Sequence, residues 1–134
     1  MRHPEYRSRL VAKEIKRGKR DDLFAATPPS EAKKALFSMA VTEGIGWHKD
    51  RRRPQMKIDF IDVRRAYFHA KCKRKVSIEL PKEDAEEGMC GMLDKSMYGT
   101  RDAAQNWEEE YSEFLVGLDF RRGLASPCLL YTSP

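Results

Sequence analysis

The sequence predicts an α+β fold, and three observations support this prediction. Apolar residues recur at helical spacing over 30–40 and again from residue 100 onward. Apolar and polar side chains alternate over 56–60 and 76–80, which is typical of strands with one buried face. These helices and strands are interleaved too irregularly for a repeating β–α–β array. The 134 residues, 40% of them hydrophobic, suffice for a single domain of roughly 100–200 residues.

The first third of the chain is predicted to contain a short strand, a turn and a helix. The strand is expected within 6–13, where apolar residues stand among cations, and an exposed turn is expected within 15–22. Ser30 follows two prolines and is expected to be the N-cap of the helix. Gly44 and Gly46 are expected to end that helix.

The remainder of the chain is predicted to contain three strands and a second helix. The strands are expected over 56–60, 76–80 and 128–131, and the acidic stretch 82–87 is expected to be a loop or a helical turn. Thr100 is expected to cap the second helix. The apolar face of this helix is expected to consist of Ala103, Ala104, Trp107, Tyr111, Phe114 and Leu115.

Charge is distributed unevenly along the chain. Residues 1–75 carry a net charge of +12 and residues 76–134 a net charge of −7, which together give the overall +5. A strongly basic segment attracts phosphates without sequence preference, so nucleic acid is the expected partner, with a solvated basic face as the open alternative. The run Arg51, Arg52 and Arg53 is open to the same two interpretations, contact with template phosphate or with solvent.

The cellular setting is constrained by what the sequence lacks. No apolar run approaches the ~18 residues of a membrane helix, so no membrane partner is expected. The N-terminus has no apolar segment of a secretory signal, and three cysteines fit a reducing compartment better than a disulfide framework. We therefore expect an intracellular protein, cytoplasmic or nuclear, that is not secreted. His69 and Cys72 are a single pair at the short spacing of zinc ligands. A zinc site is not favoured, because the sequence has no second such pair.

Asp62 is the first candidate functional residue. The alternation of Met56, Ile58 and Phe60 continues to Asp62, which places a carboxylate on the apolar face at the end of the predicted strand. Burying an unpaired carboxylate is costly, so this position favours a cleft or a bound cation. The alternative is that the strand ends at Ile61 and that Asp62 caps the following turn.

The segment that contains Asp62 resembles a known motif. Residues 62–68 (DVRRAYF) are similar to the first catalytic motif of reverse transcriptases, in which an aspartate ends a strand and is followed by alanine and aromatic residues. Further blocks are similar, in the same order, to segments of copia-type retrotransposon reverse transcriptases. These blocks are 6–13 (YRSRLVAK), 24–29 (FAATPP), 75–83 (KVSIELPKE), 96–107 (SMYGTRDAAQNW) and 118–131 (LDFRRGLASPCLLY).

The resemblance implies the fingers and the first half of the palm of a right-hand polymerase. Residues 1–53 correspond to a fingers-like segment and residues 54–134 to a partial palm, together one incomplete reverse transcriptase domain. The implied activity is RNA-directed DNA polymerisation by two-metal nucleotidyl transfer, with Mg²⁺ or Mn²⁺ as the cofactor. The implied partners are an RNA or DNA template-primer, a deoxynucleoside triphosphate (dNTP) and the remainder of the Pol polyprotein, in a cytoplasmic virus-like particle or in the nucleus.

The resemblance assigns roles around the first catalytic motif. Asp62 is implied to be the catalytic metal ligand and the backbone carbonyl of Val63 a second ligand, in keeping with the oxygen ligands that Mg²⁺ prefers. The backbone amides of Arg65 and Ala66 are implied to face the triphosphate. Tyr67 matches the aromatic residue that excludes a ribose 2′-OH, with an ordinary core aromatic as the alternative.

Two other blocks supply the remaining implied site residues. Arg9 and Lys13 match basic fingers residues near the triphosphate, where positive charge stabilises the transferring phosphates. For Lys13, plain surface charge is an equal alternative. Gly99, Arg101 and Ala103 match the loop-to-helix element that supports the template and the incoming base.

The chain departs from the family pattern in places that matter for activity. Asp102 stands where the family has glutamine, which would put an anion near the phosphates, and Ala104 replaces a proline. The family's second carboxylate site, a Tyr-x-Asp-Asp turn, does not occur in these 134 residues. We therefore expect the isolated chain to be inactive. The alternative is a non-catalytic basic nucleic-acid-binding module derived from a decayed retroelement.

Overall fold

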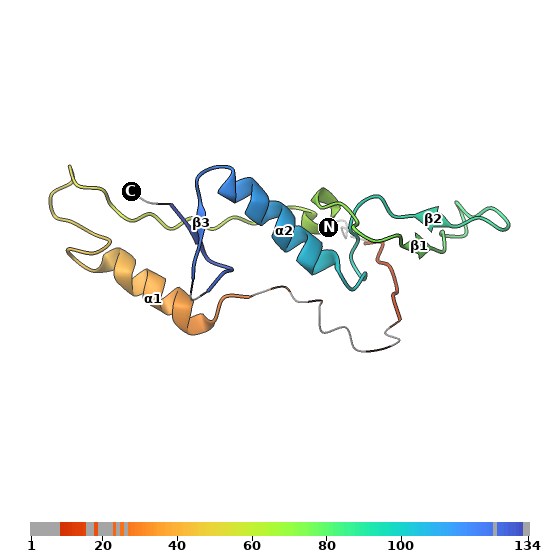
Figure 1. Cartoon of the computed structure of the whole chain (residues 1–134), viewed down its shortest axis with the longest axis horizontal. Helices are drawn as coiled ribbons and strands as arrows, with labels where there is room; N and C mark the ends of the chain where they lie inside the picture. The colour runs from red at the N-terminus through yellow and green to blue at the C-terminus, as the bar shows by residue number, and fades with distance from the viewer. Residues whose placement is uncertain are drawn as a thin grey trace, which may run out of the picture. The chain divides into compact units, whose positions relative to one another are not determined.

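The computed structural model of the chain describes residues 9–15, 18, 23, 25, 27–124 and 126–132. Helices and strands are both present, which confirms the mixed α and β content that the sequence predicts. Among the described residues, no helix is long and apolar enough to cross a membrane. The elements are, in chain order, α1 (Ser30–Val41), the 3-10 helix η1 (Ala66–His69), β1 (Ser77–Ile78), β2 (Gly91–Met92), α2 (Ala103–Val116), β3 (Arg121–Arg122) and β4 (Leu130–Tyr131) (Figure 1).

The chain forms two compact units, each built from two separate stretches of sequence. The first unit takes in residues up to 25 together with 65–110, and the second takes in 26–64 together with 111–134. The division into a fingers-like segment and a partial palm after residue 53 concerns polymerase subdomains and stays a prediction.

An antiparallel hairpin forms much of the first unit. Strands β1 and β2 pair with Ser77 opposite Met92. Backbone hydrogen bonds continue the pairing back to Ala70, whose carbonyl accepts Ser96 N–H at 2.8 Å. The strand predicted over 76–80 is therefore confirmed, although the assigned β1 is shorter.

The partner strand and the connecting loop close this hairpin. The sequence does not predict β2, because the stretch around Gly91 has no alternation of apolar and polar residues. The acidic stretch 82–87 contains a turn, as expected, in which Asp84 N–H donates to Pro81 O at 2.9 Å.

The second helix begins later than predicted and buries different residues. Thr100 is not its N-cap, because the Thr100 hydroxyl donates to Met97 O at 2.8 Å, and the helix begins at Ala103. Its start buries Ala103 and Asn106, whereas Phe114 near its end is 67% exposed. The predicted apolar face is therefore wrong at Phe114, because small and polar side chains occupy the buried positions.

In the second unit, helix α1 spans nearly the predicted range. Pro29 occupies the N-cap position instead of Ser30, and Ser30 Oγ donates to Glu31 Oε1 at 2.9 Å. The helix ends at Val41, before either predicted glycine is reached. Gly46 is nevertheless important, because it is buried and a Cβ there would overlap the backbone at the end of α1. The loop after α1 can therefore return closely against the helix.

The strand predicted over 56–60 does not form. No strand is assigned there, and Phe60 and Ile61 are 80% and 76% exposed instead of buried. The Phe60 ring stacks on Phe37, with 5.9 Å between ring centroids. Alternation favours a half-buried strand, but a strand also needs a neighbour to pair with, and the described part of the chain places no strand beside this segment. The prediction is therefore wrong for this chain.

The predicted N-terminal strand does not form either, as far as the structure describes it. Residues 9–13 have no strand assigned. Ala12 N–H donates to Tyr98 O at 2.7 Å, which attaches this segment to the first unit by one backbone bond instead of a ladder. The turn predicted within 15–22 lies, apart from residues 15 and 18, outside the described residues.

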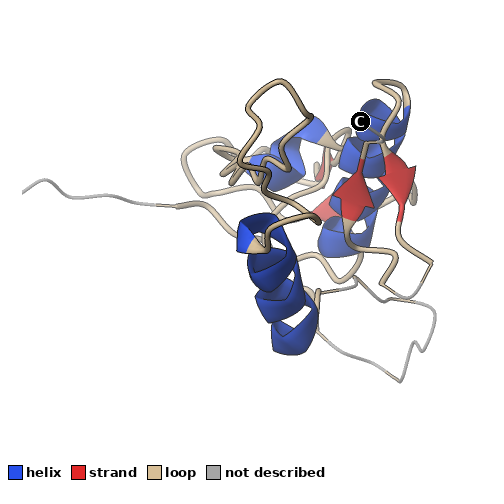
Figure 2. Ribbon diagram, turned by 90° about the vertical axis from the view of Figure 1, so that its left-hand side faces the viewer, coloured by secondary structure: helices blue, strands red, loops and turns tan. Residues whose placement is uncertain are grey.

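Strands β3 and β4 form the antiparallel pair of the second unit (Figure 2). Arg121 lies opposite Tyr131, and Arg122 lies opposite Leu130. Strand β4 falls within 128–131, so the prediction of a strand there is confirmed. Its partner β3 was not predicted, because two adjacent arginines give no apolar alternation.

Candidate functional site

The backbone turns sharply just after Asp62, which is exposed. Arg65 adopts φ 57° and ψ 40°, a left-handed conformation that is uncommon outside glycine, and η1 begins at the next residue. This turn has no side-chain cap, so Asp62 does not cap η1. The first N–H groups of a helical turn have no partner inside the turn, which leaves the amides of Arg65 and Ala66 available for the predicted triphosphate contact.

Tyr98 contacts two of the predicted site residues, Tyr67 and Arg9. Its ring centroid lies 4.6 Å from that of Tyr67 and 5.6 Å from that of Phe68, the second in an edge-to-face arrangement. Arg9 Cζ lies 5.0 Å from the centroid of the Tyr98 ring, within cation–π range. Arg9 from the N-terminal segment and Tyr67 from the first catalytic motif therefore contact the same ring.

Gly99 allows the N-terminal segment to approach this ring. Its φ of +93° is strained for any residue with a side chain, and a Cβ would overlap the carbonyl oxygen of Ala12. The Ala12 N–H bond to Tyr98 O lies at the same place. Gly99 therefore has a packing role in holding the segment that carries Arg9.

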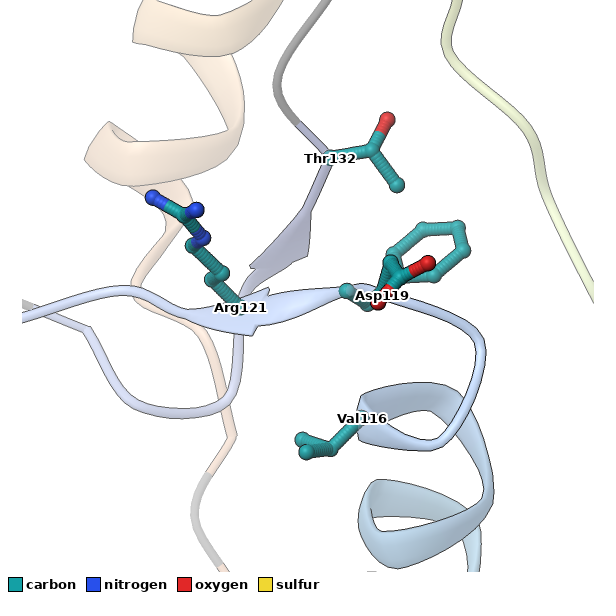
Figure 3. A pocket seen from close by; sticks show the side chains of 5 residues that line it. Val116, Asp119, Arg121 and Thr132 are labelled. Carbon is teal, nitrogen blue, oxygen red and sulfur yellow. The ribbon is translucent and has the colours of Figure 1, made fainter.

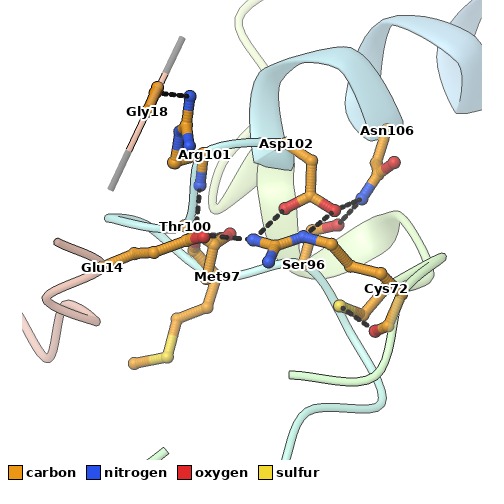
Figure 4. Close-up of polar contacts among 10 residues, drawn as sticks. Glu14, Gly18, Cys72, Ser96, Met97, Thr100, Arg101, Asp102 and Asn106 are labelled. Carbon is orange, nitrogen blue, oxygen red and sulfur yellow. Dashed lines mark hydrogen bonds and ion pairs between the residues drawn. The ribbon is translucent and has the colours of Figure 1, made fainter. Parts of the chain in front are cut away.

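An ion-pair network fixes the other end of that segment (Figure 4). Arg74 Nη2 donates to Glu14 Oε2 at 2.5 Å and to Asp102 Oδ1 at 3.0 Å. Glu14 Oε2 also accepts Arg101 N–H at 2.8 Å. Asp102, only 5% exposed, accepts a further hydrogen bond from Asn106 Nδ2 at 3.3 Å. Arg74 therefore balances the buried charge of Asp102, and the expectation that this anion lies near the phosphates stays a prediction.

The network perturbs the titration of all three charged groups. Burial by itself would raise the pKa of Asp102, but the hydrogen bonds from Arg74 and Asn106 bring that pKa below its ordinary value. Burial opposes the same effect at Glu14, whose pKa is lowered by the hydrogen bonds from Arg74 and from the Arg101 amide. The hydrogen bonds to Asp102 and Glu14 raise the pKa of Arg74. All three groups are therefore charged at neutral pH.

The remaining predicted site residues have simpler surroundings. Arg101 donates from its guanidinium to Gly18 O at 3.2 Å. Ala103 is 1% exposed at the start of α2, so its side chain has a packing role. Lys13 is exposed, which leaves both interpretations of that residue open.

A separate hollow lies beside β3 in the second unit (Figure 3). It has a volume of about 390 Å³ and contains none of the residues that the sequence assigns to the site. Asp119, at its edge, has a left-handed backbone with φ 65°. The lining residues are Val116, Asp119, Phe120, Arg121 and Thr132.

Comparison with known proteins identifies the family of the chain. A family model described as "Reverse transcriptase (RNA-dependent DNA polymerase)" matches residues 1–131. The chain belongs to the reverse transcriptase family. The "Retrovirus-related Pol polyprotein from transposon TNT 1-94" of Nicotiana tabacum is 21% identical over 132 residues, a match that covers 94% of this chain and 9% of that polyprotein. These findings confirm the resemblance to copia-type reverse transcriptases. No solved structure is significantly similar.

The sequence alone does not single out three residues that make contacts around the predicted site residues, namely Tyr98, Glu14 and Arg74. Tyr98 contacts both Arg9 and Tyr67, and its signal was its place directly before Gly99 in a family block. Glu14 and Arg74 pair across 60 residues of sequence, and no spacing rule connects two such positions. The structure is needed to bring them together.

The described residues contain no complete site for the metal that the family resemblance implies. Among the described residues, no group of three or more His, Cys, Asp or Glu side chains could hold a metal ion. The Asp62 carboxylate and the Val63 carbonyl are ligands of the kind that Mg²⁺ accepts, but its octahedral shell needs more than these two. The described residues therefore do not fit a two-metal centre by themselves, and no catalytic step through a metal follows from them.

Proposed function

We propose that the chain is part of the RNA-directed DNA polymerase of a copia-type retrotransposon, comprising its fingers and the first half of its palm. The observation that carries this proposal is the match of the reverse transcriptase model to residues 1–131. The similarity to a retrotransposon Pol polyprotein supports it and suggests that the chain acts as one segment of a longer polyprotein. It would act inside the cell, in virus-like particles or in the nucleus.

The cluster around Tyr98 supports a role in binding the incoming nucleotide. The triphosphate and the sugar are adjacent parts of one dNTP, so the residues that recognise them must lie close together. Arg9 and Tyr67 meet this requirement, because both contact the Tyr98 ring. An arginine held by a cation–π contact still has N–H groups free for phosphate oxygens. Tyr67 would exclude a ribose 2′-OH by its volume.

The template side of the site would be formed by the loop before α2. Gly99 and Arg101 lie in this loop, and Arg101 N–H is fixed by Glu14. The same carboxylate contacts Arg74, so the template loop and the N-terminal segment share one anchor. A shared anchor would keep Arg9 and the template loop at a fixed distance from each other. Polymerisation requires such a fixed arrangement, because the triphosphate must be aligned with the template base.

Nucleotidyl transfer by this family would need carboxylates from outside these 134 residues. Asp62 and the Val63 carbonyl would supply two of the oxygen ligands of a Mg²⁺ or Mn²⁺ ion, and this ion, when bound, would neutralise negative charge on phosphate. Since no Tyr-x-Asp-Asp sequence occurs in the chain, we propose that the isolated chain does not polymerise DNA.

A non-catalytic nucleic-acid-binding module is the second candidate function. The net charge of +12 over residues 1–75 favours it, because such a segment binds phosphates without any metal or dNTP. Both candidates predict RNA binding that weakens with salt, so binding alone does not separate them.

Metal-dependent primer extension separates the two candidates. We expect no extension by the isolated chain in Mg²⁺. When the same 134 residues stand within a polyprotein that supplies the second carboxylate motif, we expect extension that Asp62→Ala abolishes. Asp59→Ala, which removes an exposed acid three positions before Asp62, should leave extension intact. Extension that survives Asp62→Ala would remove the metal-ligand assignment, and extension by the isolated chain would overturn the proposed inactivity.

A further inference from the structure

The loop that follows α1 is closed by hydrogen bonds at its base. Gln55 binds His48 twice, accepting from His48 N–H at 2.9 Å and donating to His48 O at 3.1 Å. Just outside this pair, Met56 N–H donates to Gly46 O at 2.8 Å. These bonds fix both ends of residues 47–55, which we call the Trp47 loop.

The Trp47 loop presents an aromatic ring beside a pocket. Trp47 is 44% exposed and lines a pocket of about 430 Å³ in the second unit. This volume is within the range of roughly 300–1,000 Å³ that ligand pockets occupy. Lys49 and Arg51 line the same pocket. The other lining residues are Ala40, Gly46, His48, Gln55 and Met56.

The three consecutive arginines of the Trp47 loop are available for an anionic ligand. Arg51, Arg52 and Arg53 are exposed, and no described acidic side chain forms an ion pair with them. The acid in this run, Asp50, accepts Arg52 N–H with its side chain at 3.0 Å and Arg53 N–H with its carbonyl at 3.1 Å. Asp50 therefore shapes the turn that displays the three guanidinium groups.

Lys49 differs from these arginines. It forms an ion pair with Glu43 at 3.3 Å, so part of its charge is balanced by a described residue. Both groups are well exposed, and such a pair is weak enough to yield to a phosphate. The net charge of the Trp47 loop therefore stays positive even when Glu43 and Asp50 are counted.

We propose that the Trp47 loop is a docking site for single-stranded nucleic acid, with one base stacked on Trp47 and the adjacent phosphates held by Arg51–Arg53. The proposal rests on the proposed function and names a surface of the second unit that would hold the template strand. Sequence-independent single-strand sites combine a stacking aromatic ring with cations that follow the backbone, and this loop supplies both within one rigid turn. An unpaired base can enter beside the indole, whereas a base inside a duplex is already stacked.

Binding of a fluorescent oligo(dT) of about 12 nucleotides to the full chain tests the phosphate contacts. We expect Arg51→Gln/Arg52→Gln/Arg53→Gln to reduce the slope of log K against log salt by about 2, at about 0.7 per lost contact with a single strand. The matched control is Lys33→Gln/Lys34→Gln/Lys82→Gln, which removes three exposed lysines outside the loop and should leave the slope nearly unchanged. Equal changes in the two triple variants would overturn the proposal.

Tryptophan fluorescence tests the stacking contact, since the chain has only Trp47 and Trp107. We expect oligo(dT) to quench the wild-type emission, Trp47→Phe to remove the quenching, and Trp47→Ala to weaken binding about tenfold. Far-UV circular dichroism checks that each variant is folded. If Trp47→Ala does not fold, Trp47→Phe still tests the stacking contact. Quenching that persists in Trp47→Phe, or tighter binding to duplex than to single strand, would contradict the proposal.

These outcomes are independent of polymerase activity. Asp62→Ala should leave oligo(dT) binding unchanged while it abolishes primer extension by the longer polyprotein. Failure of the loop variants to affect binding would therefore reject the Trp47 loop and leave the proposed polymerase function standing. Loss of the proposed function would instead be seen in the extension assay alone.

Discussion

Arg74 and Glu14 lie 60 positions apart in the sequence, yet Arg74 Nη2 and Glu14 Oε2 are 2.5 Å apart in the folded chain. Glu14 stands on the segment that carries Arg9, and Arg74 leads into the β1–β2 hairpin. Because Arg74 also bonds Asp102, one guanidinium connects three segments that local sequence patterns treat as unrelated. The segment that carries Arg9 is therefore held in part by a contact with Arg74, which is far from Arg9 in the sequence.

Arg74→Ala should destabilise the chain by about 2–3 kcal/mol in the free energy of unfolding. The variant leaves Glu14 and the buried Asp102 without their counter-charge, and the effect lies between those of exposed and fully buried pairs because Arg74 is 31% exposed. Urea denaturation measures it. The neighbouring Lys73→Ala is the control, because its ion pair with Glu109 is exposed and should be worth about 0–1 kcal/mol. Equal losses in both variants would contradict the special role of Arg74.

Acid should destabilise the chain through the same network. The pKa values of Glu14 and Asp102 are lower in the folded state than the ordinary 4.5 and 3.8. Their stabilising contribution is therefore complete above those ordinary values and is lost as the pH falls through the folded values. Arg74 stays charged throughout. Denaturation midpoints measured from neutral pH down to about pH 3 should fall less steeply in Asp102→Asn than in the wild type. An unchanged acid dependence in that variant would contradict this assignment.

Gly99→Ala should release the N-terminal segment from the loop that precedes α2. The side chain would be strained at φ +93° and would overlap Ala12 O, so we expect a loss of more than about 2 kcal/mol and faster exchange of the Ala12 amide hydrogen. Gly88→Ala is a matched control, because Gly88 also has a positive φ, +76°, but has open space around its Cβ position. It should cost about 1–2 kcal/mol and leave the Ala12 amide protected. Similar exchange at Ala12 in both variants would show that the contact is unimportant.

Tyr67→Ala should relax sugar selection in a polyprotein that restores the palm. Removing the ring opens the space that a ribose 2′-OH would occupy, and we expect the ratio of kcat/KM for deoxynucleotides over ribonucleotides to fall by about tenfold or more. Single-nucleotide incorporation measures both values. Tyr67→Phe keeps the ring on Tyr98 and should preserve the ratio. Unchanged selectivity in Tyr67→Ala would assign Tyr67 to packing against Tyr98 alone.

The sequence predicts those parts of the fold that local chemistry determines. Helix α1, strand β1 and strand β4 form where capping residues, spacing and alternation place them, with small differences at their ends. The family blocks also predict that Arg9 and Tyr67 belong to one site, and the structure shows that both contact Tyr98, which the sequence alone does not reveal. Local patterns therefore define elements and candidate residues but not their contacts.

The failures have a common physical cause, which is dependence on distant partners. Residues 56–60 have the alternation of a strand, but a strand requires a neighbour for its hydrogen bonds. Phe114 follows the apolar spacing of α2, yet the helix buries Asn106, whose amide has a partner in Ser96 Oγ at 3.0 Å. Sequence patterns near Asp102 likewise do not reveal Arg74, which pairs with it from 28 positions away. In each case a partner distant in the sequence, or the lack of one, decides the outcome.

The exposure of Phe60 and Ile61 has a consequence for handling the chain. Two adjacent large apolar side chains on an unpaired segment favour self-association, because another chain can cover them and supply backbone hydrogen bonds. Self-association should therefore increase with protein concentration, and it should decrease when a complementary strand is co-expressed. Asp62 directly follows these two residues, so the event that prevents aggregation would also place the proposed metal ligand at the end of a formed strand. The solubility of the chain and the position of this proposed ligand would then depend on the same pairing partner.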